Sequence, residues 1–161
     1  MAVWHKVIRD EEYLKTFMEM NWEFHDCREE RITYIAETNS VEIFLKYDTG
    51  AEGVLIQFKD VHGFNVRVGK DYEAEWIGGV SCLLLPGNSF LWIVEDELSL
   101  DKSEQIEEAK KYCTWVEAES IIWAVTDGEG NPIDMPEDRI NQTWNVWGET
   151  VEKHFKVMAC E

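Results

Sequence analysis

Three adjacent side chains near the start of the chain combine an imidazole, a carboxylate and a thiol: His25, Asp26 and Cys27. A neighbouring imidazole lowers the pKa of a thiol and can convert it into a nucleophilic thiolate. Adjacent residues on a strand point to opposite faces, so His25 and Cys27 would share one face and Asp26 would lie on the other. His25 and Cys27 are therefore the only catalytic candidates, although we favour a structural His–Asp contact beside a buried Cys27.

Metal and cofactor signatures are missing elsewhere. The acidic loop Asp127–Asn131 has oxygen-bearing side chains at alternating positions, but Pro132 stands where a calcium loop needs Gly, so we interpret it as a turn. The remaining histidines and the cysteines are too scattered for a zinc site: His5, His62, His154, Cys27, Cys82, Cys113 and Cys160. No phosphate-binding, dinucleotide-binding or hydrolase motif occurs. We expect no metal and no cofactor.

The clearest helical pattern lies at the end of the chain. Its apolar positions are spaced 4, 3, 4, 3, 4: Ile140, Trp144, Trp147, Val151, His154 and Met158. This spacing predicts a long helix with one apolar face, packed on a sheet or, alternatively, on the same helix of a second copy in a homodimer. Trp144 and Trp147 are thus candidate partner- or ligand-binding residues, together with Asp26.

The rest of the chain indicates strands. Alternating apolar residues, turn signals and capping residues predict a short helix over 10–20, strands around 32–34, 41–47, 54–58 and 64–68, a hairpin of 76–85 with 89–95, a short helix after Asp101, and a strand over 115–125. The fold class is α+β: an antiparallel sheet of six or seven strands, a long C-terminal helix on one face, and one or two short helices. We find no linker, so residues 1–161 form one predicted domain.

Charge is the most unusual bulk property. The chain has 33 acidic and 15 basic residues, a formal net charge of −18. Such a field repels nucleic acid and anionic lipid and attracts basic protein surfaces. The sequence has neither a membrane-length apolar run nor a secretory leader pattern, so we expect a cytoplasmic protein.

Residues 22–69 carry a family resemblance. The segment from Trp22 to Cys27, the strands around Ile32–Ile35 and Val41–Leu45, and the strand that ends at Val61 resemble bacterial β-rich domains, some of which are predicted to be toxin-immunity proteins. The resemblance implies a β-rich fold and a protein partner.

Two function hypotheses follow. The leading one is a small, acidic, non-enzymatic binding protein, in its narrowest form a bacterial immunity protein that neutralises a basic toxin. The alternative is a small-ligand binder or enzyme with an aromatic-lined pocket that uses Cys27 and His25.

Overall fold

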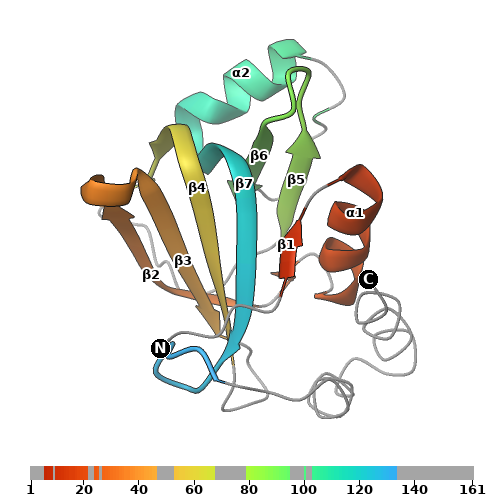
Figure 1. Cartoon of the computed structure of the whole chain (residues 1–161). Helices are drawn as coiled ribbons and strands as arrows, with labels where there is room; N and C mark the ends of the chain where they lie inside the picture. Colours follow the sequence, from red (N-terminus) through yellow and green to blue (C-terminus); the bar gives the residue numbers. More distant parts are fainter. Residues whose placement is uncertain are drawn as a thin grey trace.

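The computed structural model describes residues 6–8, 10–21, 24–25, 27–46, 53–67, 79–94, 100 and 103–133. These residues form a sheet and two α-helices, labelled in Figure 1. The strands are β1 (Lys6–Ile8), β2 (Arg28–Ile35), β3 (Ser40–Lys46), β4 (Gly53–Asn65), β5 (Val80–Leu84), β6 (Phe90–Val94) and β7 (Thr114–Thr126), and the helices are α1 (Glu11–Met20) and α2 (Ser103–Tyr112). The described part of the chain is therefore α+β.

All seven of these strands belong to one antiparallel sheet in which the long strand β7 is central. β4 pairs with one edge of β7 along its whole length. The other edge is shared, because β1 pairs with residues 121–123 and β6 with residues 114–118. The strand order is β2-β3-β4-β7-β6-β5, with β1 beside β7. The predicted antiparallel sheet of six or seven strands is confirmed, and β2 and β5 are its outermost strands in the described part.

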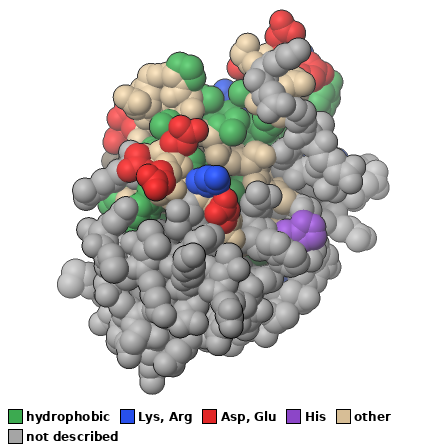
Figure 2. All heavy atoms as spheres, turned by 90° about the vertical axis from the view of Figure 1, so that its right-hand side faces the viewer, with side chains coloured by type: hydrophobic (Ala, Val, Ile, Leu, Met, Phe, Trp, Pro, Cys, Tyr) green, Lys and Arg blue, Asp and Glu red, His purple; other side chains and the backbone are tan. Residues whose placement is uncertain are grey.

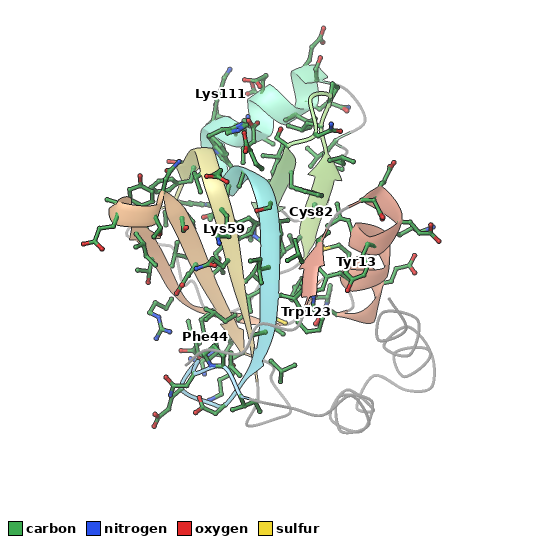
Figure 3. The ribbon with its side chains drawn as sticks, viewed as in Figure 1. Tyr13, Phe44, Lys59, Cys82, Lys111 and Trp123 are labelled. Carbon is green, nitrogen blue, oxygen red and sulfur yellow. The ribbon has the colours of Figure 1, made fainter. Side chains whose placement is uncertain are left out.

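One face of the sheet, which we call the inner face, carries the main core and is partly covered by α1 (Figure 1). Phe17 of α1 is fully buried, and its ring centroid lies 5.2 Å from that of Trp123 and 5.6 Å from that of Phe24. Burying a Phe side chain contributes roughly 1.5–3 kcal/mol. Figure 3 shows Trp123 on the side of β7 that faces α1. This aromatic contact fixes the position of the helix against the sheet.

The outer face has a smaller core beneath α2. Leu91 and Ile93 of β6 pack there with Ala109 of α2, while Phe90 and Trp92 of the same strand point to the inner face. A strand that is buried on both sides is apolar at every position. This explains why the sequence of β6 shows a continuous apolar run instead of alternation.

The prediction of separate strands over 54–58 and 64–68 is wrong, because β4 is continuous from Gly53 to Asn65. Asp60 has a positive φ of 55°, and the register with β7 shifts between Val61 and Gly63. A bulge adds one residue to a strand and reverses the alternation of its side chains. In the sequence, Lys59, Asp60, His62 and Gly63 interrupt the apolar alternation at this irregularity, which gives the pattern of two strands where the chain forms one.

Other local predictions are confirmed. Asp10 caps α1, since its Oδ1 accepts a 2.7 Å hydrogen bond from the Tyr13 N–H. β5 and β6 form the predicted hairpin, and Gly87 has the positive φ, 95°, that a type II turn requires. The predicted C-terminal helix over 140–158, including Trp144 and Trp147, lies outside the described residues and stays a prediction.

Candidate functional site

A groove of about 380 Å³ lies between α1 and the outermost strand β5. Its helical wall consists of Glu11, Leu14, Lys15, Met18 and Glu19, and its other wall is the whole of β5, residues 80–84. Figure 2 looks onto this side of the molecule, where acidic side chains lie beside hydrophobic ones. The groove brings together residues about 70 positions apart in the sequence.

The helical wall is held in place by the apolar side of α1, which packs into the main core and also contributes Leu14 and Met18 to the groove. Leu14 and Met18 are 3% and 7% exposed and belong to the main core, as does Phe17. Residues four apart on a helix lie on one side of it, so Glu11, Lys15 and Glu19 form a charged row along the groove. The exposed pair Lys15–Glu19, with 3.8 Å between Nζ and Oε1, adds little stability because water screens it. Two carboxylates and one ammonium line the groove.

The other wall offers backbone groups. The Leu85 N–H donates to the Ser89 carbonyl at 2.8 Å, which fixes the phase of the β5–β6 ladder. In an antiparallel ladder, hydrogen-bonded and non-bonded pairs alternate. Ser81 and Leu83 therefore bond to β6, whereas the N–H and C=O groups of Val80, Cys82 and Leu84 point away from β6, at the edge of a strand that lines the groove.

Cys82 lies in the middle of this wall, and Figure 3 shows it on β5, near α1. Burial raises the pKa of its thiol well above the ordinary value. A neutral thiol is a weak nucleophile near neutral pH. The groove therefore has backbone and carboxylate groups for binding but no activated nucleophile among its lining residues.

A second polar cluster lies on the outer face, beside α2. The His62 Nδ1 is 3.2 Å from Glu117 Oε2, and its Nε2 is 3.4 Å from Glu119 Oε1. Hydrogen bonds to Glu119 and then to Glu117 raise the pKa of His62. Lys110 of α2 completes the cluster, with its Nζ 3.2 Å from Glu117 Oε1 and 4.5 Å from the ring centroid of Trp115. Both imidazole nitrogens are used within the protein, so the cluster is a structural clamp between strands and helix.

Two further carboxylates have distinct surroundings. The Oε2 of Glu29 is buried and has no hydrogen-bond partner among the described residues, and burial raises the pKa of this side chain. Asp127 is the opposite case: its Oδ1 accepts the N–H groups of Asn131 and Glu129, at 3.0 and 2.9 Å, and these bonds lower its pKa. Asp127 thus closes its own loop, as expected for the predicted acidic turn.

The candidates chosen from the sequence lie away from the groove or outside the described residues. His25 is exposed in the turn between α1 and β2, while Cys27 is fully buried in the main core. Both residues precede β2, which begins at Arg28, so the face-sharing expected on a strand does not apply. Asp26, Trp144 and Trp147 lie outside the described residues.

Sequence reasoning missed the groove. Each of its walls looks ordinary alone, since α1 is an amphipathic helix and β5 is half of a hairpin. The signal that was available is the row Glu11, Lys15 and Glu19, which the sequence places on one side of the predicted helix. Nothing local to the sequence places β5 beside that row.

Comparisons with known proteins found no matching family model, no matching curated protein and no matching solved structure. No helix in the described part of the chain has the length and apolar character needed to cross a membrane. Within the same residues, no three His, Cys, Asp or Glu side chains are grouped so that they could hold a metal ion.

Proposed function

We propose that this protein is a small acidic binding protein without enzymatic activity, which recognises a protein partner with a basic surface. The observation that supports this most directly is the groove, where carboxylates of α1 lie beside the backbone of an outermost strand. The net charge of −18 extends the attraction over the whole molecule. Complementary charge speeds association and sets specificity.

The narrower proposal concerns the biological class of the partner. The resemblance of residues 22–69 to predicted immunity proteins supports a secreted bacterial toxin as the partner and the bacterial cytoplasm as the place of binding. The first described strands of this segment, β2 and β3, lie at the end of the sheet opposite β5. The resemblance and the groove are therefore separate arguments for a binding protein.

The test is capture from cells of the natural source at low salt, with three baits: the unaltered protein, a Glu11→Lys/Glu19→Lys variant, and a Glu37→Lys/Glu129→Lys control with the same net charge. Glu37 and Glu129 are exposed and do not line the groove. We expect a partner that the groove variant loses, the control keeps and salt releases. Purified, that partner should bind the unaltered protein directly.

Two results would contradict the proposal. A captured protein that both variants lose equally would be responding to net charge alone, and one that all three baits retain equally would not use the groove. Turnover of a small molecule by the purified chain would make it an enzyme. For the narrower proposal, the identified partner should arrest growth when expressed alone and not when co-expressed with this protein.

A further inference from the structure

We propose that the groove binds an extended basic segment of the partner as an added antiparallel strand on β5, with Lys or Arg side chains at every second position directed at α1. This inference rests on the proposed function, since it specifies how the partner is held.

The backbone of β5 has one edge that does not bond to β6. The N–H and C=O groups of Val80, Cys82 and Leu84 point away from β6, and β5 pairs only with β6 among the strands that the structure describes. A row of such groups, two residues apart, is a template for strand addition. The groove leaves space along this edge, since its walls include all five residues of β5.

The ladder geometry also fixes the direction of the side chains of an added strand. Residues of an added antiparallel strand that exchange hydrogen bonds with Cys82 and Leu84 place their side chains on the same face as these two residues. That face is the inner face, because Cys82 and Leu84 both pack against the main core, where α1 also lies. Every second side chain of the added strand is thus directed at the charged row of α1.

The exposure of the α1 residues determines which side chains fit. Leu14 and Met18 are already 3% and 7% exposed, so they offer little further apolar surface. Glu11 and Glu19 are exposed carboxylates in the same wall. Lys and Arg lay an aliphatic stem along apolar surface and extend their charge to its edge. The stems of Lys or Arg can pack on the partly buried side chains of Cys82 and Leu84. Their charged ends can then reach the carboxylates of Glu11 and Glu19.

The negative charge of the groove disfavours the other occupants. A second copy paired through β5 would bring its own Glu11 and Glu19 into the dimer interface. Their carboxylates would lie near those of the first copy, and like charges in proximity are unfavourable. Residues 134–161 of this chain carry six acidic and three basic residues, so that segment also has the wrong sign. A basic segment of a different protein is the occupant that the groove matches.

The experiment uses the full chain and a synthetic peptide of alternating Lys and Thr, about nine residues long, at low salt. Amide hydrogen exchange is measured by NMR with and without peptide. We expect the N–H groups of Cys82 and Leu84 to become at least about tenfold more protected, while those of Ser81 and Leu83, which already bond to β6, change little. A peptide of alternating Glu and Thr should not bind.

N-methylated peptides test the direction of the hydrogen bonds without altering the protein. In the proposed antiparallel arrangement, the Lys residues direct their N–H groups at β5 and the Thr residues direct theirs away. Methylation of the Lys nitrogens should therefore abolish binding, and methylation of the Thr nitrogens should leave it nearly unchanged. Equal effects at both sets of positions would overturn strand addition.

Protein variants test the two walls separately. Leu84→Pro removes an N–H that points away from β6 and no bond to β6, so it should block binding in a folded protein. Leu83→Pro is the control that removes a ladder bond and should destabilise the hairpin. Glu11→Lys/Glu19→Lys should weaken peptide binding about tenfold, from roughly threefold for each exposed ion pair, and Glu37→Lys/Glu129→Lys, with the same net charge, should weaken it much less.

The remaining outcomes separate this inference from the proposed function. Slow exchange at Cys82 and Leu84 in the free protein would mean that the edge is already covered and would overturn the proposal; dependence on protein concentration would then identify a second copy, and independence would identify the chain itself. A natural partner that needs Glu11 and Glu19 but leaves both amides unprotected would keep the function and overturn strand addition. If partner binding does not depend on Glu11 and Glu19 and the amides of Cys82 and Leu84 stay unprotected, both the proposed function and strand addition are overturned.

Discussion

At the scale of single residues, burial decides which side chains can react. Cys27 is fully buried in the main core, and burial holds the pKa of the Cys82 thiol above its ordinary value. A thiol needs both access and a lowered pKa to be a nucleophile near neutral pH. The sequence places Cys27 next to an imidazole, but sequence proximity says nothing about access.

Alkylation measures this directly. We expect iodoacetamide near neutral pH to modify Cys27 in the folded protein more than about a hundredfold more slowly than in the unfolded chain, because modification requires local opening. Mass spectrometry of timed digests gives the rate for each cysteine, and the denatured protein is the control. Rapid modification of Cys27 in the folded state would restore it as a catalytic candidate.

His62 is predicted to make stability depend on pH. Its carboxylate partners raise its folded-state pKa, so the protonated ring is stabilised by folding. The stabilisation of the folded state by protonated His62 is complete at pH values below 6.5, the ordinary pKa of histidine. It is lost as the pH rises through the higher folded-state pKa. We expect Glu119→Gln and Glu117→Gln each to lower the pKa of His62 in an NMR titration and to flatten the pH dependence of the unfolding midpoint. A Glu37→Gln control should change neither, and an unaltered His62 pKa in both partner variants would contradict the clamp.

At the scale of elements, the sequence predicts best where local rules and tertiary packing agree. α1 has a cap, acidic residues in its first turn and an apolar stripe, and the β5–β6 hairpin has its Pro-Gly turn. β4 is the instructive failure. The chain has a positive φ at Asp60 and a register shift between Val61 and Gly63 within one strand, and Gly63 is the residue whose type could have indicated a bulge in place of a turn.

The groove was not predictable for a related reason. It exists because α1 and β5 both contact the inner-face core, and their approach is set by Phe17, Trp123 and other buried residues far apart in the chain. Periodicity assigns a residue to a face, but it does not say which elements meet across that face. Which β5 residues direct their N–H and C=O groups at β6 likewise depends on how the hydrogen bonds alternate along the two strands. The hydrogen bond between Leu85 and Ser89 shows this alternation, and it is visible only in the structure.

The cap of α1 should therefore affect both stability and binding. Asp10→Ala removes the hydrogen bond to the Tyr13 N–H and should lower the free energy of unfolding by about 1 kcal/mol. Asp10→Asn keeps a capping oxygen and is the matched control. Because Glu11 follows the cap directly, fraying of the first turn should also weaken the basic peptide in Asp10→Ala more than in Asp10→Asn. Calorimetry and peptide titration measure the two effects, and equal stabilities of the two variants would show that the cap is dispensable.

At the scale of the whole molecule, the surplus of carboxylates acts on folding and on binding with opposite signs. The chain carries 33 acidic and 15 basic residues, and described ion pairs such as Lys111–Glu108, 2.9 Å between Nζ and Oε2, are exposed. Such pairs add little stability, and the excess negative charge repels itself in the compact state. The same excess attracts a basic partner.

Salt should separate these two consequences. Raising NaCl from about 0.01 M to 0.1 M shortens the screening length from about 30 Å to about 10 Å. Self-repulsion then falls, so the unfolding midpoint at pH 7 should rise, and each kcal/mol gained corresponds to roughly 2–4 °C for a chain of this size. Over the same range the affinity for the Lys-Thr peptide should fall, because its attraction to Glu11, Glu19 and the overall field is screened as well. Calorimetry and titration on one sample series measure both effects, with KCl as a control for ion identity. A midpoint that falls with salt, or an affinity that rises, would show that net charge does not have the role assigned to it.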